Sequence, residues 1–130
     1  MEPPLVVISN TDPDFLELMS ELLCDEGYDT LVVTGHQEAF EICLQCQPQL
    51  VILELIITNP ERGWRVLNKM RLHPQTANIP TIIATTATQL IRDNEAHLRS
   101  KSCDILLMPF DLEELLTLVG AIIPTSTTHS

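Results

Sequence analysis

The chain has 130 residues, of which 45% are hydrophobic, and its formal net charge is −11 at pH 7; this length suits one folded domain and is too short for two. No apolar stretch approaches the roughly 20 residues of a membrane-spanning helix, and the start lacks the basic region of a signal peptide, so we expect a cytoplasmic protein without membrane contact. The negative charge repels phosphate backbones, so we do not expect nucleic-acid binding.

Strand-like apolar runs alternate with helical patterns along the whole chain. The five predicted strands cover residues 5–8, 30–33, 50–54, 81–84 and 104–107. This alternation with short connections predicts an α/β protein with a doubly wound parallel sheet and five helices. The third strand is apolar from Leu50 to Leu53, which indicates burial on both faces, and it ends on the carboxylate of Glu54. Open α/β sheets place their binding sites at such strand ends.

The helical patterns carry recognisable start and stop signals. The first helix should begin after Asp12, an N-cap followed by Pro13, and stop at Gly27. Its apolar face comprises Phe15, Met19, Leu22 and Leu23. We expect the second helix over about 37–47 and the third from about Gly63, with Val66, Leu67 and Met70 facing inward.

The last two helices differ in the strength of their patterns. The fourth is predicted over about 88–100, with Ile91 and Leu98 as its apolar anchors. The fifth begins with the capping spacing Asp111-Leu112-Glu113-Glu114. Its core-facing residues should be Leu112, Leu115, Leu116 and Val119. We therefore expect one domain over 1–123, followed by a polar, disordered tail over 124–130 and no output domain.

Two cysteines of the second helix, Cys43 and Cys46, have the spacing of a metal or redox motif. The chain offers no second cysteine pair and no histidine at ligand spacing to complete a metal site. Both cysteines fall on one helical face with Ala39 and Ile42. We therefore interpret them as buried thiols of the core.

Acidic residues recur along one face of the first helix, at Asp14, Glu17, Glu21 and Asp25. A solvated helix face is the favoured interpretation of such a stripe. A docking surface for a basic partner is the alternative.

Several short motifs resemble the receiver domain of bacterial response regulators (the CheY-like superfamily) over about residues 5–123, with matching order and spacing apart from about one extra residue between Glu54 and Gly63. They are Asp12-Pro13-Asp14-Phe15, Gly27-Tyr28, the strand ending at Glu54, Gly63, Ile79-Pro80, Thr85 and Pro109-Phe110. The resemblance implies a flavodoxin-like receiver fold with strand order 2-1-3-4-5 and a role in two-component phosphorelay signal transduction. In that family an aspartate at the position of Glu54 accepts a phosphoryl group from a histidine kinase.

The positions that carry the family's chemistry are altered here. Asn10 and Thr11 stand where paired acids hold Mg²⁺, although magnesium sites want carboxylate oxygens. Met108 replaces the lysine that pairs with the phosphoryl group, and it carries neither charge nor donor. Glu54 is one methylene longer than the family's aspartate. Asp12 as an N-cap and the solvent-facing Asp14 are not expected to replace the missing acids.

Two further positions belong to the family's switch. Thr85 retains the hydroxyl that would contact a phosphoryl oxygen, whereas Ile105 replaces the switch aromatic. Two interpretations of Glu54 remain open. Its carboxylate either accepts hydrogen bonds from Thr11 or Thr85 at a drifted position, or it is a permanent partial mimic of an aspartyl phosphate, with one charge against about two.

These departures predict a stand-alone degenerate receiver, or pseudo-receiver, that is not an enzyme and acts through protein–protein interaction. We expect no phosphorylation, no Mg²⁺ and no other cofactor. The partner would be a signalling kinase, a regulator or an output protein, or a second copy bound through the fourth helix, fifth strand and fifth helix. The alternative is a receiver that still responds to phosphoryl transfer or a metal at Glu54.

Overall fold

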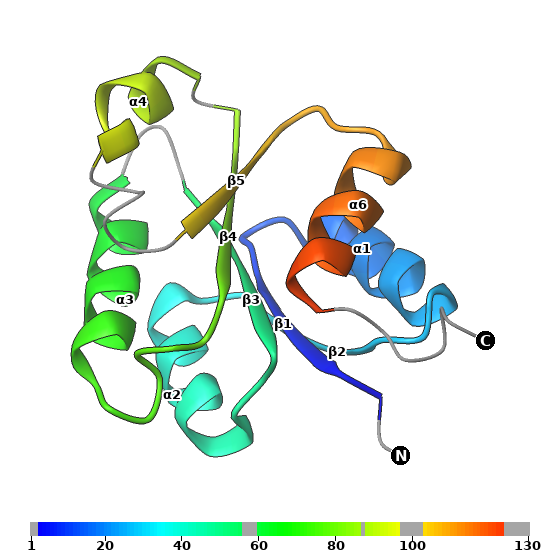
Figure 1. Cartoon of the computed structure of the whole chain (residues 1–130), viewed down its shortest axis with the longest axis horizontal. Coiled ribbons are helices and arrows are strands. Elements are labelled where there is room, and N and C mark those ends of the chain that lie inside the picture. Colours follow the sequence, from blue (N-terminus) through cyan, green and yellow to red (C-terminus); the bar gives the residue numbers. More distant parts are fainter. Residues whose placement is uncertain (1–2, 56–59, 87, 97–102, 124–130) are drawn as a thin grey trace.

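The computed structural model describes residues 3–55, 60–86, 88–96 and 103–123. These residues form a five-stranded parallel sheet in the order β2-β1-β3-β4-β5, with helices on both faces (Figure 1). The predicted α/β class and strand order are confirmed. None of the helices within these ranges is long and apolar enough to cross a bilayer.

Each strand lies within one residue of its predicted bounds. The strands are β1 Leu5–Ser9, β2 Asp29–Val33, β3 Leu50–Glu54, β4 Thr81–Thr85 and β5 Cys103–Leu107. In the register, Val51 of β3 lies between Val7 of β1 and Thr81 of β4. The first four residues of β3 are buried because helices cover both faces of the sheet.

Two groups of helices bury the two faces of the sheet. The helices are α1 Pro13–Asp25, α2 His36–Cys46, α3 Pro60–Leu72, α4 Thr88–Asp93 and α6 Leu112–Ile122. Helices α1 and α6 pack on one face, around Ile52 and Met19, whereas α2, α3 and α4 pack on the other, around Val51 and Leu67 (Figure 1). Each face thus has its own apolar cluster.

The predicted start and stop signals act as expected in the first and last helices. The carboxylate of Asp12 accepts a hydrogen bond from the backbone N–H of Asp14 at 3.0 Å, and that of Asp111 accepts one from Glu114 at 2.8 Å. Gly27 follows α1 with a φ of +94°, a left-handed conformation that glycine adopts without strain. Local hydrogen bonding therefore sets these helix ends.

The predicted start of α3 near Gly63 was wrong, because the helix begins at Pro60. Gly63 lies inside the helix, where α3 approaches the end of β3 closely. A Cβ atom on Gly63 would lie 3.0 Å from Cδ1 of Leu55 and 3.2 Å from the carbonyl oxygen of Glu54. The glycine permits close packing and does not mark a helix terminus.

The predicted fourth helix is interrupted, since α4 ends at Asp93 and Glu95 and Ala96 are helical again after Asn94, while residues 97–100 lie outside the described residues. A turn follows, in which the N–H of Asn94 bonds to the carbonyl of Ile91 at 3.2 Å. The predicted anchor Leu98 and the predicted tail over 124–130 lie outside the described residues.

Helical periodicity misplaced two side chains that were expected in the core. Leu112 is 44% exposed and Cys46 is exposed, whereas Leu115 and Cys43 of the same helices are fully buried. Leu112 is the first residue of α6 and Cys46 is the last residue of α2. Periodicity gives the angle of a side chain around the helix axis but not how far the core extends along it.

Candidate functional site

The predicted site residues lie together at the carboxyl edge of the sheet. Glu54 ends β3, Thr85 ends β4, and Asn10 and Thr11 follow β1 directly. The parallel register aligns Ser9 with Leu53 and Glu54 with Ala84, so these strand ends are neighbours. The topology therefore gathers residues that are up to 75 positions apart in the chain (10 to 85).

The half-buried Glu54 carboxylate is held by the loop after β1. Its Oε1 accepts a hydrogen bond from the backbone N–H of Thr11 at 2.9 Å and from the Thr11 hydroxyl at 3.0 Å. The hydrogen bond expected from Thr11 is present. These two hydrogen bonds hold the carboxylate against the loop, because both bonds must be broken before the carboxylate can move.

Asn10 performs a structural task in this loop. Its side chain is only 3% exposed, and its Oδ1 accepts a hydrogen bond from the N–H of Asp12 at 2.8 Å. Its own N–H donates to the carbonyl of Val33 at 3.1 Å. The amide of Asn10 thus stabilises the turn that leads from β1 into α1.

The two nearby aspartates do not join this arrangement. Asp12 caps α1, as described above, and Asp14 is exposed on the first turn of that helix. Glu61, another carboxylate close to Glu54 in the chain, is also exposed. Asp12 and Asp14 thus have the capping and solvated roles that were expected of them.

Thr85 and Met108 are the other predicted site residues at the carboxyl edge of the sheet. Thr85 is fully buried, and its hydroxyl donates to the carbonyl of Leu55 at 3.0 Å. The N–H of Met108 donates to the carbonyl of Thr85 at 2.8 Å. The Met108 side chain packs against the apolar cluster of α1 and α6, where Phe15 and Phe110 meet edge to face at 6.4 Å. An apolar contact therefore replaces a cation at this position.

The described oxygens do not match the requirements of Mg²⁺. Glu54 supplies a carboxylate at this edge, and its Oε1 already accepts two hydrogen bonds from Thr11, while the carboxylate of Asp12 caps α1. The amide oxygen of Asn10 accepts a backbone hydrogen bond as well. Within the described residues no group of three or more acidic, histidine or cysteine side chains is placed to hold a metal. Mg²⁺ is a small, hard cation that binds anionic oxygens and water molecules in octahedral geometry, and oxygens that already accept hydrogen bonds are poor ligands for it.

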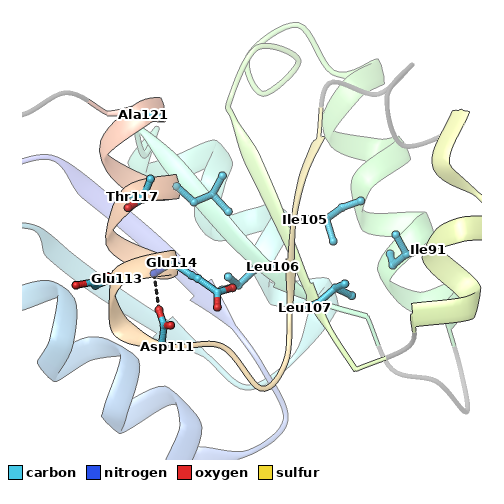
Figure 2. A pocket seen from close by; sticks show the side chains of 10 residues that line it. Ile91, Ile105, Leu106, Leu107, Asp111, Glu113, Glu114, Thr117 and Ala121 are labelled. Atoms are coloured by element: carbon cyan, nitrogen blue, oxygen red, sulfur yellow. Dashed lines mark hydrogen bonds between the residues drawn. The ribbon is translucent and has the colours of Figure 1, made fainter.

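Ile105, at the position of the switch aromatic, belongs to a second feature, a surface groove of about 790 Å³ across β5. We call this feature the β5 groove. It is lined by Ile91, Ile105, Leu106, Leu107, Asp111, Glu113, Glu114, Thr117, Leu118 and Ala121. Figure 2 shows Ile91, Ile105 and Leu107 on the α4 side of the strand and Glu113 and Thr117 on α6. The groove therefore joins α4, β5 and α6 in one surface.

Sequence reasoning named the fourth helix, fifth strand and fifth helix as the partner surface, but it did not predict a groove there or most of its lining residues. The spacing Glu113, Thr117, Ala121 places these residues on one face of α6, four positions apart. That face lies opposite to the core-facing stripe and gives no clear pattern, because it mixes polar and small residues. Its relation to β5 becomes visible only when the strand order is known.

The cysteine pair of α2 lies away from both features. Burial raises the pKa of the Cys43 thiol to about 12, and the neighbouring Cys46 contributes in the same direction. A thiol with a raised pKa is a poor nucleophile and a poor metal ligand at neutral pH, because both roles need the thiolate. The interpretation as a core thiol holds for Cys43, whereas Cys46 is exposed.

The sheet order, the helices on both faces and the strand-end site define a flavodoxin-like receiver fold. The family model of the response regulator receiver domain matches residues 6–120. The chain therefore belongs to the response regulator receiver domain family, which acts in two-component signalling.

Curated relatives include proteins of Synechocystis and Leptolyngbya boryana. The DNA-binding dual master transcriptional regulator RpaA of Synechocystis is 32% identical over 98% of this chain, which spans 54% of that protein. An uncharacterised 14.6 kDa protein from the sodA1 3′ region of Leptolyngbya boryana is 30% identical over 88% of the chain and is itself 86% covered. The chain thus spans about half the length of the RpaA relative.

Solved structures support the fold. The chemotaxis protein CheY4 of Vibrio cholerae superimposes with a TM-score of 0.82 at 18% identity, covering 93% of this chain and 99% of the other. A signal receiver domain from Clostridium thermocellum gives a TM-score of 0.79 at 24% identity, covering 94% and 98%. At these identities the likeness concerns the fold alone.

Proposed function

We propose that this chain acts as a degenerate receiver domain. In this proposal it binds a protein partner through the surface of α4, β5 and α6, without phosphorylation at Glu54 and without Mg²⁺. One observation carries the proposal. The Glu54 carboxylate, which stands at the phosphoacceptor position, is held by two hydrogen bonds from Thr11, at 2.9 and 3.0 Å.

The cost of phosphorylating Glu54 supports the proposal. Attack through Oε1, or a rotation of the carboxylate toward a phosphodonor, would break its hydrogen bonds to Thr11, each worth about 1 kcal/mol. The incoming phosphoryl group would bring about two negative charges next to Met108, which has no charge to offset them. Phosphoryl transfer depends on positioning and charge neutralisation, and this edge is poor in both.

The switch that couples phosphorylation to the output surface is also altered. In this fold a hydroxyl at the end of β4 would turn toward the phosphoryl group, but the Thr85 hydroxyl donates to the carbonyl of Leu55 at 3.0 Å. Ile105 is an aliphatic residue that packs against the cluster of α2, α3 and α4. A ligand shifts a conformational equilibrium only if it binds the two states differently, and these side chains offer little basis for such a difference.

The surface of α4, β5 and α6 keeps features that suit the binding of a protein partner. The β5 groove is lined by apolar and acidic side chains, and protein partners use such surfaces. RpaA is named a DNA-binding regulator, but a net charge of −11 on this chain opposes direct contact with a phosphate backbone. We therefore assign the output to a protein partner.

The test uses Trp64, a partly buried residue of α3, as a fluorescent reporter. Millimolar Mg²⁺ followed by acetyl phosphate should leave its emission and the intact mass of the protein unchanged. The control is a repaired variant that carries Asn10→Asp, Thr11→Asp, Glu54→Asp and Met108→Lys, which should respond to Mg²⁺. A mass gain of one phosphoryl group on Glu54, or saturable quenching by Mg²⁺, would support the alternative of a responsive receiver.

A further inference from the structure

The β5 groove combines apolar side chains with uncompensated negative charge. Leu107 is 39% exposed, Ile105 is partly buried on the same side of β5, and Leu118 is partly buried on α6. Glu113 and Glu114 are exposed on α6. Of the described residues that line the groove, none is a lysine or an arginine. The groove therefore presents apolar surface and anionic charge to the same ligand.

The first groove acid, Asp111, has a partner in the helix itself. Its carboxylate accepts the N–H of Glu114 at 2.8 Å and meets the positive end of the α6 dipole. Glu113 and Glu114 have no ion pair within the described part of the chain. Their charges thus remain available to a cationic partner, and the net charge of −11 attracts such a partner.

We propose that the β5 groove binds a basic amphipathic helix of a partner protein, whose apolar side chains enter the groove while lysine or arginine side chains meet Glu113 and Glu114. This inference rests on the proposed function, because it names the chemistry of the partner that the surface of α4, β5 and α6 takes. Helices commonly bind by placing one apolar face into a groove of this kind.

The structure favours a helix over an added strand. β5 is an edge strand, and a strand could in principle pair with its outer edge. It has only five residues, however, and Asp104 lies exposed in it. Short length and a charged residue are the features that keep sheet edges from pairing with other chains.

The charges also disfavour a second copy of this chain as the occupant. In a two-fold symmetric contact the same surface meets itself, so Asp111, Glu113 and Glu114 would face their own copies. Within the described residues α4 has one exposed basic residue, Arg92. Each copy would therefore bring one positive charge to the contact against three carboxylates. Like charges at an interface penalise association, whereas a basic helix relieves the same charges.

The test uses a fluorescent helical peptide built from leucine and lysine, and a twin peptide in which glutamate replaces every lysine. Anisotropy at about 0.15 M salt, where charges are screened beyond about 8 Å, should show saturable binding of the lysine peptide. The glutamate peptide should bind at least about tenfold more weakly. Amide NMR shifts should change at Ile105, Leu107 and Leu118.

Matched variants separate the groove from general attraction to an acidic protein. Glu113→Lys with Glu114→Lys should weaken binding about tenfold or more. Glu17→Lys with Glu21→Lys makes the same charge change on the exposed face of α1 and should change binding by less than about twofold. Leu107→Gln should weaken binding, whereas Leu72→Gln, at the 82% exposed end of α3, should not.

Several results would overturn the inference: no binding of the lysine peptide, equal binding of both peptides, or equal effects of the α6 and α1 charge variants. Sedimentation of the chain alone should show a monomer, and a dimer that Glu113→Lys disrupts would assign the groove to self-association instead. Binding that appears only after Mg²⁺ and acetyl phosphate are added would support the groove's chemistry but contradict the proposed phosphorylation-independent function. The two proposals can therefore fail separately.

Discussion

The strand-end site around Glu54 and the β5 groove belong to one receiver fold but use their polar groups in opposite ways. At the strand-end site the carboxylate of Glu54, the amide of Asn10 and the hydroxyl of Thr85 all hydrogen-bond within the chain. In the groove Glu113 and Glu114 are exposed beside apolar side chains. Polar groups that already hydrogen-bond within the chain have little hydrogen-bonding capacity left for a ligand. Exposed charge next to apolar surface favours ligand binding.

The largest expected effect concerns the attachment of the helix that forms one wall of the groove. Leu115→Ala removes a fully buried side chain from the cluster under α6 and should lower the free energy of unfolding by about 3 kcal/mol. Leu112→Ala, at a 44% exposed position of the same helix, should cost less than about 1 kcal/mol. Urea denaturation measures both, and equal losses would show that α6 is not anchored as described.

The next effect tests what the strand-end site lacks. The repaired variant with Asn10→Asp, Thr11→Asp, Glu54→Asp and Met108→Lys should bind Mg²⁺ yet unfold about 1–3 kcal/mol more easily without it, since three carboxylates then repel one another. Mg²⁺ should restore part of this stability by binding the folded state. Thermal unfolding with and without Mg²⁺ gives both quantities.

The single substitution Glu54→Asp is the control for that repair. It supplies the family's acceptor without acidic metal ligands or a lysine, so it should show no Mg²⁺-dependent stabilisation and no mass gain with acetyl phosphate. Phosphorylation of this single variant would mean that the missing metal ligands and cation matter far less than the charge argument holds.

The fold was more predictable than the site because its signals are local. The apolar run from Leu50 to Leu53 and the capping residues Asp12 and Asp111 act within a few residues of themselves, and all were placed correctly. Gly63 was misinterpreted because its role, close contact with β3, depends on a residue eight or nine positions away in the chain, Glu54 or Leu55. Such tertiary contacts leave no local pattern.

The contacts of the strand-end site were also hard to predict, because they too join residues far apart in the chain. The sequence predicted correctly that Glu54 lies at the end of the third strand. It did not distinguish between Thr11 and Thr85 as the hydrogen-bond donor to Glu54. The geometry provides bonds from Thr11 to Glu54 and a bond from Thr85 to the Leu55 carbonyl. The surface of α4, β5 and α6 was named from the resemblance, but the groove on it was not predicted, because its lining residues meet only once the three elements are assembled.

A smaller effect measures how firmly Thr11 holds Glu54. Thr11→Val removes the hydroxyl donor at 3.0 Å but keeps the backbone N–H donor at 2.9 Å, so the free energy of unfolding should fall by about 1 kcal/mol. Thr34→Val is a matched control at an exposed loop position and should stay within about 0.5 kcal/mol of the wild type. If the two variants lose equally, the Thr11 hydroxyl does not restrain Glu54.

The smallest effect comes from α2, a region that belongs to neither feature. The Cys43 thiol ionises near the ordinary thiol pKa of 9.0 when the chain is unfolded, whereas burial raises its pKa in the folded state to about 12. Above pH 9 the unfolded state therefore binds fewer protons, so stability falls as the pH rises from about 9 to about 12. Between about pH 8 and pH 9 the loss should be a few tenths of a kcal/mol.

Cys43→Ala is the control for this pH dependence. It should flatten the slope, while Tyr28, whose pKa is raised chiefly by burial and then by Glu26, leaves a residual fall at higher pH. Urea denaturation across this pH range is the measurement. An unchanged slope in Cys43→Ala would assign the effect to other groups.

The central claim is that the β5 groove is available without any signal from the strand-end site. Amide NMR of the wild-type chain, recorded before and after Mg²⁺ and acetyl phosphate, tests it directly at Thr11 and Thr85 in the site and at Ile105 and Leu118 in the groove. The account predicts that none of these amides shifts beyond a matched salt control. Saturable shifts at both the site and the groove would show that the two are coupled and that the chain is a working phosphorylation switch.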